Sequence, residues 1–332
     1  MRFGLFAAVL VSASVLPLPS APAQQAAPWR IGVLLWHRSP NDLQALEGIR
    51  VALRRSGRAH ELEVVEADSD EARAVELIAQ LRARPVALIV AMGTQAALLC
   101  KRHVTDLPVV FTAVTNPVES KLVPDWSGSG SNLAGNSNWI EPGTVLDVFR
   151  LAVPGLARLG VLRSSSTGVV SAAELASMRA LLAGDRAPAV TLHEELADDV
   201  DGLDAAVARL AQAKVQAIWI PIDFLVYENI SRVAAAARRH GVPLVSSSLR
   251  GVTEGAVAGL VVDYETLGER AVLIVLDVLE GRREPGAIQV GRMAGYQVVV
   301  NLAAARRAGY EVPLPMLAVA DLILDDESEA KR

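Results

Sequence analysis

The strongest fold signal in the chain is the stretch Ala87-Leu88-Ile89-Val90-Ala91-Met92-Gly93-Thr94-Gln95-Ala96-Ala97. Its continuous aliphatic run predicts a buried strand over 87–91, and the apolar spacing that follows predicts a helix over 94–103. Glycine and threonine stand at the junction, where the strand would turn into the helix. A strand, a short polar turn and a helix in this order form one unit of a parallel α/β sheet.

The same unit recurs on both sides of this stretch, before and after a Gly/Ser-rich run at 127–131. In the first half, strands are expected at 31–35, 62–66, 87–91 and 108–112, with helices over 43–56, 70–82 and 94–103. In the second half, strands are expected at 158–162, 189–192, 217–220 and 243–246, with helices over 143–151, 172–182, 201–213 and 230–240. Aliphatic strands separated by amphipathic helices predict parallel sheets covered on both faces. Two consecutive sets therefore predict two similar Rossmann-like α/β lobes.

The chain of 332 residues is also longer than one hydrophobic core usually serves, which is about 250–300 residues. A strand at 259–263, a helix over 267–280 and a strand at 297–301 are enough to complete both lobes and to cross between them. We expect a first lobe of 29–137 and 251–288, a second lobe of 138–250 and 289–326, and a flexible tail of 327–332. The crossings at 137–142, 249–253 and 285–291 would form a multi-strand hinge.

The N-terminus has the pattern of a secretory signal peptide. Arg2 precedes an apolar run from Leu5 to Leu16, and Ala21-Pro22-Ala23 provides a small-residue cleavage site. The alternative is an uncleaved anchor, but the run is short for a bilayer span. No cysteine lies at the end of the signal, so we expect no lipid attachment. The pattern predicts export, removal of residues 1–23 and a periplasmic mature protein.

Composition excludes several classes of function. The chain is 52% hydrophobic and 21% charged, as in a globular protein, and its net charge of −5 without a basic cluster disfavours nucleic-acid binding. No second apolar run reaches membrane-spanning length, so we expect a soluble mature chain. Cys100 is the only cysteine, which rules out an intramolecular disulfide. Its apolar helical surroundings favour a buried structural thiol over a reactive one.

Catalytic and metal-binding motifs are missing from the sequence. It contains no G-x-S-x-G elbow, H-E-x-x-H motif, P-loop or G-x-G-x-x-G fingerprint. The acidic stretch from His193 to Asp201 leaves two alternatives, a metal site or a solvated loop and helix start, and we favour the second. We therefore expect no enzyme, no cofactor and no metal.

Candidate ligand-binding residues lie at the carboxyl ends of the predicted strands, where open parallel sheets bind their ligands. They are rich in hydroxyl groups and poor in charge. The candidates are Trp36, His37, Gly93, Thr94, Gln95, Thr115, Asn116, Pro117, Ser164, Ser165, Ser166, Thr167, Asp223, Ser246, Ser247 and Asp263. Glycine allows close approach of the backbone to a ligand, and Thr94 could bind an anion beside free N–H groups. The alternative for Thr94 is that it only caps its helix.

Four segments carry a resemblance to a known family. They are 90–97 (Val-Ala-Met-Gly-Thr-Gln-Ala-Ala), 108–118 (Pro-Val-Val-Phe-Thr-Ala-Val-Thr-Asn-Pro-Val), 263–271 (Asp-Tyr-Glu-Thr-Leu-Gly-Glu-Arg-Ala) and 300–315, which includes Gly309-Tyr310-Glu311-Val312-Pro313. In these segments the chain resembles the solute-binding proteins of ABC importers, in the group typified by tryptophan- and tyrosine-binding receptors. The resemblance spans nearly the whole mature chain and implies the type I periplasmic binding protein fold.

The resemblance also implies which turns face the ligand. Gly93-Thr94 and Thr115-Asn116-Pro117 would face it from the first lobe, and Asp223 and the 164–167 loop from the second. The chain departs from the family at three places. Asn116 replaces the usual Asp before Pro, Ala134 replaces the hydroxyl residue before Gly135, and the 163–166 loop lacks the usual asparagine and proline. The ligand could therefore differ from the aromatic amino acids bound elsewhere in the group.

These observations together predict a periplasmic solute-binding protein that docks on an ABC permease of the inner membrane and acts as a monomer. The expected ligand is a small amino-acid-like or carboxylate-bearing solute. Its anionic group would lie near Thr94 and Thr115, and its amino group near Asp223. The alternative is an exported sensor protein that signals to a membrane receptor or kinase. A third class, an exported α/β enzyme, is disfavoured by the missing catalytic motifs.

Overall fold

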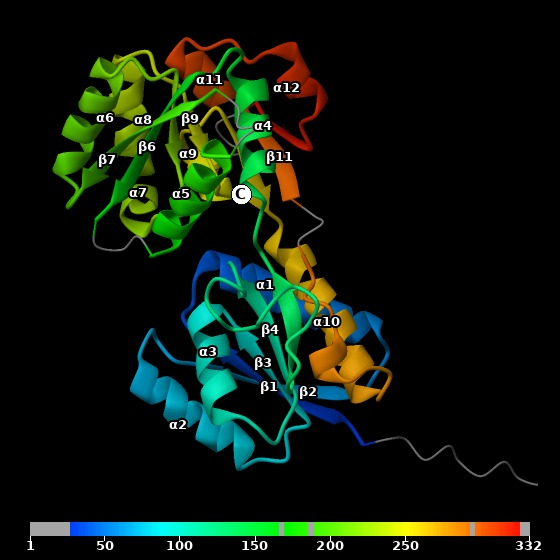
Figure 1. Ribbon diagram of the computed structural model, residues 1–332. Coiled ribbons are helices and arrows are strands. Elements are labelled where there is room, and N and C mark those ends of the chain that lie inside the picture. Colours follow the sequence, from blue (N-terminus) through cyan, green and yellow to red (C-terminus); the bar gives the residue numbers. More distant parts are fainter. Residues whose placement is uncertain (1–26, 166–168, 185–188, 293–295, 326–332) are drawn as a thin grey trace, which may run out of the picture.

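A parallel sheet of five strands forms the centre of the first lobe (Figure 1), in the order β2-β1-β3-β4-β5. The computed structural model describes residues 27–165, 169–184, 189–292 and 296–325. The predicted signal peptide, Ser166, Thr167 and residues 326–332 lie outside these ranges. The strands of the first lobe are β1 (Trp29–Leu35), β2 (His60–Glu66), β3 (Leu88–Met92), β4 (Val109–Val114) and β5 (Leu133–Ser137). β5 was missed in the sequence because Gly135 and Asn136 interrupt its aliphatic pattern.

Two pairs of helices cover the faces of this sheet. The pair α1 (Pro40–Arg55) and α10 (Tyr264–Leu279) packs on one face, and α2 (Glu71–Arg82) and α3 (Thr94–His103) pack on the other. α1 and α10 approach each other so closely that a Cβ atom on Gly48 or Gly268 would overlap a backbone carbonyl of the opposite helix. Glycine at these two positions allows the contact. Cys100 of α3 is buried, and burial raises the pKa of its thiol to about 12, as expected for a structural cysteine.

The second lobe contains a sheet of seven strands in the order β12-β11-β10-β9-β8-β6-β7. Its strands are β6 (Arg158–Ser164), β7 (Thr191–Ala197), β8 (Ala217–Ile220), β9 (Leu244–Ser246), β10 (Ala258–Val262), β11 (Tyr296–Asn301) and β12 (Leu322–Leu324). All pairs are parallel except β10 with β11, which departs from the expected all-parallel sheet. The reversal arises because the chain enters β11 from the first lobe.

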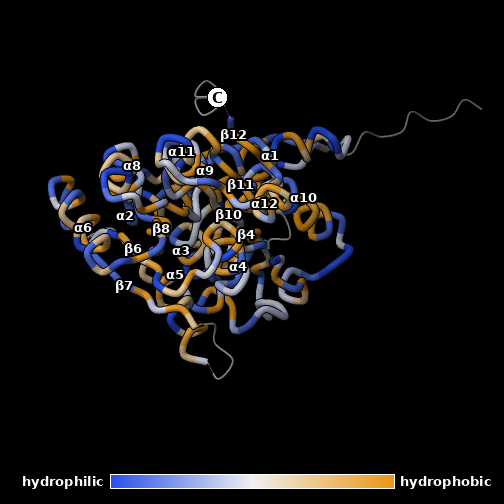
Figure 2. The backbone as a smooth tube through the Cα atoms, turned by 90° about the horizontal axis from the view of Figure 1, so that it is seen from above, coloured by the Kyte–Doolittle hydropathy of each residue, from blue (hydrophilic) through white to orange (hydrophobic). Residues whose placement is uncertain are grey.

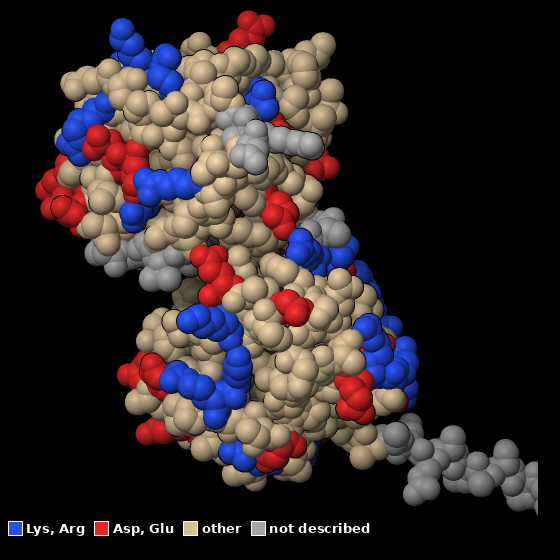
Figure 3. Space-filling model, in the orientation of Figure 1, with Lys and Arg blue, Asp and Glu red and all other residues tan. Residues whose placement is uncertain are grey.

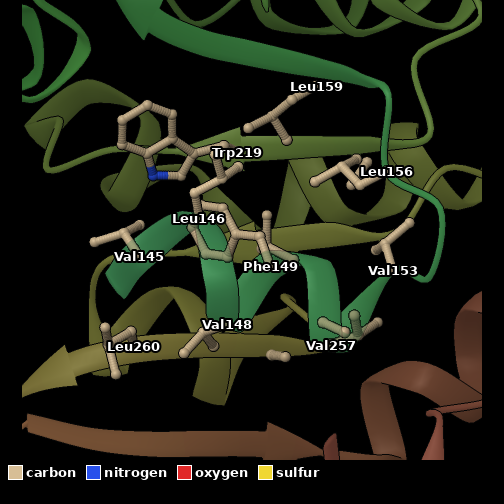
Figure 4. Packing of buried hydrophobic residues seen from close by; sticks show 14 of the residues in the cluster. Val145, Leu146, Val148, Phe149, Val153, Leu156, Leu159, Trp219, Val257 and Leu260 are labelled. Carbon is tan, nitrogen blue, oxygen red and sulfur yellow. The ribbon is translucent and has the colours of Figure 1, made fainter. Parts of the chain in front are cut away.

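Helices again cover both faces of the second sheet. One face carries α4 (Pro142–Ala152), α5 (Val169–Leu182), α11 (Leu302–Ala308) and α12 (Leu314–Ala318). The other carries α6 (Gly202–Gln212), α7 (Phe224–Glu228), α8 (Ile230–Arg239) and α9 (Leu249–Glu254). In the core under α4, the ring of Phe149 packs near the ring of Trp219 (Figure 4), with 6.0 Å between the two ring centroids. Apolar strand segments run through the middle of the molecule, and hydrophilic segments gather at its edges (Figure 2).

The chain crosses between the lobes at three places, and one of them differs from the expectation. It leaves β5 for α4 through 138–141 and leaves β10 for α10 at Asp263. It then passes the 3-10 turn Pro285–Ala287 and runs beside β5, where Gly291 N–H donates to the carbonyl of Gly135 at 2.9 Å. The expected first-lobe segment 251–262 is wrong, and so is the crossing at 249–253, because β10 pairs with β9 and β11 in the second sheet.

The crossings orient the two sheets toward each other. Ser137 at the carboxyl end of β5 leads directly into the second lobe, and Val262 at the carboxyl end of β10 leads directly into the first. The carboxyl edge of each parallel sheet therefore faces the other lobe. A narrow waist separates the lobes at this level (Figure 3).

Candidate functional site

Both sheets repeat the same topology, which defines where a ligand would bind. Within each lobe the first strand lies between the second and the third, as β1 lies between β2 and β3 and β6 lies between β7 and β8. In doubly wound sheets this switch point opens a crevice beyond the carboxyl ends of the strands. The crevices of the two lobes face each other, so the fold directs both of them into one cleft.

A cavity lies in this cleft and takes its wall from both lobes. Thr115 contributes from the first lobe, the crossing segment contributes Asn138, Trp139 and Ile140, and Pro142 contributes from the start of α4. The second lobe contributes the remaining residues, which are Val145, Glu174, Met178, Trp219, Ile222, Ser247 and Val262. Of the residues expected from sequence, the cavity wall includes Thr115 and Ser247. Most of the other wall residues are apolar, which suits a ligand with an apolar part.

The Gly93-Thr94 turn begins helix α3 without a side-chain cap. Gly93 is the N-cap with a φ of 90°, a left-handed conformation that favours glycine, and Thr94 is the first helical residue. The alternative reading of Thr94 as a simple helix cap is therefore wrong. Trp36 lies beside this turn, since a Cβ on Gly93 would lie 3.6 Å from its Cβ. The uncapped N–H groups of α3 offer hydrogen-bond donors and the positive end of a helix dipole.

The turn after β4 is held by Asn116. Its Oδ1 accepts a hydrogen bond from the Glu119 N–H (3.1 Å), and its Nδ2 donates to Glu119 Oε2 (3.2 Å). Pro117 is buried, and Thr115 is half-buried at the cavity wall. The amide of Asn116 thus stabilises its own turn, while Thr115 is the residue of this turn that reaches the cavity.

Asp223 has a structural role in this conformation. It is 1% exposed and accepts hydrogen bonds from Ser164 N–H (2.8 Å), Ser164 Oγ (2.9 Å), Ser171 Oγ (3.2 Å) and Val226 N–H (3.2 Å). These bonds cap α7 and tie it to the carboxyl end of β6 and to α5. Asp223 is absent from the cavity wall, so the structure does not bring it together with Thr115.

The remaining candidates divide between the cleft and its surroundings. Ser247 accepts a hydrogen bond from Trp219 Nε1 (2.9 Å), and Ser246 Oγ accepts one from the Ser248 N–H (3.2 Å). Asp263 caps α10, accepting from the N–H and the hydroxyl of Thr266. His37 and Gln95 are exposed, and the exposed Ser165 hydrogen-bonds to Asp198; Ser166 and Thr167 lie outside the described residues.

Glu174 of α5 is the acidic residue at the cavity wall that the sequence analysis missed. It is half-buried, and its carboxylate accepts a hydrogen bond from the Ile222 N–H at 2.7 Å. Burial raises the pKa of this carboxyl to about 7, against the opposing effect of the Ile222 hydrogen bond. Ser171 and Met178, spaced three residues before and four after it, are both buried. A charged residue on a buried helical stripe was the available signal.

Asn138 and Tyr264 lie on two crossings that meet at the cleft. Asn138 is 7% exposed, and its Nδ2 donates to the Tyr264 hydroxyl at 3.1 Å. Its Oδ1 is buried and has no hydrogen-bond partner among the described residues. Burial raises the pKa of Tyr264 to about 12, and the nearby charges of Asp42 and Glu174 add to this shift. Asn138 thus combines a place in the cavity wall with a buried acceptor that has no partner among the described residues.

The acidic stretch 193–201 begins in a strand, which corrects the expected loop. β7 includes His193, Glu194 and Glu195, with Glu194 paired to Arg163 (2.6 Å) and Arg179 (2.6 Å). In the described part of the chain, no three His, Cys, Asp or Glu side chains are placed to hold a metal ion. No helix within the described ranges is long and apolar enough to span a membrane.

Comparison with known proteins gives one family match over most of the chain. Residues 30–323 match the family described as ABC transporter substrate binding protein. A curated relative, the tyrosine-binding protein of Clostridioides difficile, is 27% identical over 214 residues, which are 64% of this chain and 60% of the relative. The chain thus matches about 60% of the length of that relative.

Solved structures share the fold. A ligand-free, open substrate-binding protein with adhesive properties from Clostridium difficile superimposes with a TM-score of 0.77 at 20% identity, covering 90% of this chain and all of the other. The ABC domain from Streptococcus pneumonia, solved in complex with L-Trp, gives a TM-score of 0.71 at 24% identity and covers 89% of this chain and all of the other. Type I periplasmic binding proteins have this two-lobed architecture, which confirms the fold predicted from sequence.

Proposed function

The chain belongs to the ABC transporter substrate-binding protein family, and we propose that it is the periplasmic solute receptor of an ABC importer. In this role it captures a small amino-acid-like or carboxylate-bearing solute in the cleft between its lobes and delivers it to an inner-membrane permease as a monomer. The observation that carries the proposal is the cavity whose wall combines residues of both lobes and of the crossing between them.

The two sides of the cleft suit different parts of such a solute. The uncapped N-terminus of α3, with the Thr94 hydroxyl, favours an anionic group on the first lobe. The second lobe and the crossing present apolar surface from the partly buried Trp139, Ile140 and Ile222. Amino acids bound by the relatives in Clostridioides difficile and Streptococcus pneumonia support an amino-acid-like ligand here.

A thermal-shift screen of free amino acids and their carboxylate analogues, followed by calorimetry, tests the ligand class. A ligand at 100 times its Kd stabilises the folded state by about 2.7 kcal/mol, which is a shift of a few degrees for a chain of this size. Native mass spectrometry of the purified protein gives an independent identification. A co-purified solute with neither a carboxylate nor an amino group would contradict the proposed class.

Closure of the lobes around the solute is the step that would signal a loaded receptor to the permease. Small-angle scattering should show a smaller radius of gyration when the identified solute is saturating. An unchanged radius at saturation would indicate a rigid site.

Export is tested separately from binding. N-terminal sequencing of the protein from a periplasmic extract should begin at Gln24, directly after the Ala21-Pro22-Ala23 site. A cytosolic protein that retains Met1 would overturn the proposed location.

A further inference from the structure

Glu174 occupies the switch point of the second sheet. α5, which carries it, follows β6, and Ile222, whose N–H it accepts at 2.7 Å, follows β8. The two strands are neighbours in the sheet, and the crevice opens between their carboxyl ends. Glu174 therefore lies at the point of the second lobe that the topology directs toward the ligand, and it forms part of the cavity wall.

The surroundings of Glu174 leave its charge uncompensated. Its wall neighbours include Met178, Trp219 and Trp139, which supply no cation. No Lys, Arg or His among the described residues forms an ion pair with it, and one backbone N–H is its hydrogen-bond donor. Burying a carboxylate without a cation is costly, and the raised pKa of Glu174 reflects that cost.

Asn138 adds a second acceptor to the same cavity from a different element. It lies on the crossing between the lobes and is more than nine-tenths buried, and its Oδ1 has no hydrogen-bond partner among the described residues. The Asn138 Nδ2–H is already used, because it donates to the Tyr264 hydroxyl at 3.1 Å. A carboxylate and an unpaired carbonyl oxygen together match the donors of an ammonium group.

We propose that Glu174, together with Asn138 Oδ1, receives the cationic amino group of a solute whose apolar part packs against Trp139, Ile140 and Ile222. This inference rests on the proposed function and refines it. Asp223, the carboxylate expected from sequence to bind an amino group, is fully engaged in holding the turns of its own lobe. With asparagine at 116, Glu174 is the carboxylate that remains available at the cavity wall.

Matched pairs of probes test the proposal. Each pair consists of an amino acid and its analogue without the amine: L-tryptophan with indole-3-propionate, L-tyrosine with 3-(4-hydroxyphenyl)propionate, and L-leucine with 4-methylpentanoate. Calorimetry on the full mature chain should show at least tenfold tighter binding of the amino acid in a pair that binds. E174Q should weaken that amino acid at least tenfold and leave the affinity for the amine-free analogue unchanged. N138L should have the same selectivity with a smaller loss.

The controls separate a binding role from a structural one. E228Q removes an exposed carboxylate of the second lobe that pairs with Arg250, and it should leave both affinities unchanged. If Glu174 only latched the Ile222 turn, E174Q would weaken the two members of a pair equally, and that result would overturn the proposal. If wild-type protein bound both members equally, the proposal would fail while the proposed function survived. If wild-type protein bound none of the six probes at millimolar concentration, the proposal of a solute with an amino group and an apolar part would fail, and the wider thermal-shift screen would decide the ligand class.

Discussion

The helix that follows the first strand of each lobe carries a carboxylate, and the two carboxylates have different hydrogen-bond partners. Asp42 lies in α1, directly after β1, and Glu174 lies in α5, after the equivalent strand β6. Asp42 is surrounded by partners from its own turn: Ser39 Oγ donates to it at 2.5 Å, and His37 Nδ1 lies 3.5 Å away. Glu174, by contrast, accepts one hydrogen bond, from the backbone N–H of Ile222. The helix after β1 thus holds a carboxylate with two side-chain partners, and the helix after β6 holds one with a single backbone donor. This difference favours the second lobe as the receiver of a positive charge.

In the first lobe, α1 packs closely against α10 at Gly268, and Gly268→Ala should have the largest effect on stability. A Cβ at 268 would overlap the Ala45 carbonyl, so α1 and α10 must separate. We expect a loss of about 3 kcal/mol or more in the free energy of unfolding, the upper range for overpacking. Thermal unfolding followed by circular dichroism measures it.

Gly143→Ala is the matched control in the second lobe. Gly143 lies in α4, and a Cβ there would meet no atom within 4 Å. Alanine should be neutral or stabilise by up to about 1 kcal/mol through its helix propensity. If the two variants unfolded at the same temperature, the close α1–α10 contact would not limit the stability of the first lobe.

Asp223→Ala tests whether this buried carboxylate of the second lobe has a structural role, in contrast to Glu174. It leaves the hydrogen-bond donors of Ser164, Ser171 and Val226 without their buried acceptor. We expect a loss of about 2–4 kcal/mol in the free energy of unfolding, because charge-assisted bonds are lost in a buried setting. Asp263→Ala, which removes the half-exposed cap of α10, should cost about 1 kcal/mol. Chemical denaturation of both variants compares them, and equal losses would contradict the structural role of Asp223.

The pH dependence of stability tests the under-satisfied state of Glu174. Its folded-state pKa of about 7 lies above the ordinary value of 4.5. Between these values the native state keeps a proton that the unfolded state has lost, so the free energy of unfolding falls as pH rises. Each pKa unit corresponds to about 1.4 kcal/mol, and partial exposure to cavity water reduces the total to about 1–3 kcal/mol.

E174Q removes this titration. Relative to wild type, the variant should gain stability from pH 5 to pH 8, whereas E228Q should follow the wild-type curve. Urea denaturation at the two pH values measures the difference. A parallel pH dependence of E174Q and wild type would show that Glu174 is not strained in the native state.

Local patterns in the sequence predicted most of the fold because most strands and helices leave their own periodic signal, whereas β5, with Gly135 and Asn136, does not. The aliphatic run before Gly93 predicted β3, and the Gly93-Thr94 turn predicted the start of α3. The predicted lobe boundary at residue 251 was wrong because the local sequence of α9 and β10 does not indicate which lobe they belong to. The pairing of Ala258 with Val245 places β10 in the second sheet.

The cleft was predicted less completely than the fold. The rule that ligands bind at the carboxyl ends of parallel strands predicted Thr115 and Ser247, which lie on turns at that edge of the sheets and line the cavity. It missed Glu174 because that residue lies inside a helix, and it assigned Asp223 an exposed role because the serines that enclose it are distant in sequence. Contacts between segments far apart in the chain determine which carboxylate is free, and these are not encoded in local spacing.

The smallest effect concerns the first lobe, where Thr94→Ala compares the turn that we propose to face the ligand with a capped turn. The Thr94 hydroxyl makes no capping hydrogen bond, since Gly93 is the N-cap of α3. Ser39, by contrast, caps α1 by accepting from the Asp42 N–H at 3.1 Å. If the Thr94 hydroxyl binds the solute carboxylate, Thr94→Ala should weaken binding by about 1 kcal/mol, roughly fivefold, with an unchanged unfolding temperature of the free protein.

Ser39→Ala should give the opposite result. Loss of the cap should lower the free energy of unfolding by about 1 kcal/mol and leave the affinity nearly unchanged. Calorimetry with the solute identified in the screen, together with thermal unfolding of the free proteins, places both variants on the same two axes. If Thr94→Ala destabilised the free protein and kept full affinity, Thr94 would be a structural residue. The anionic group of the solute would then have to lie elsewhere on the first lobe, with the half-buried Thr115 as the next residue to test.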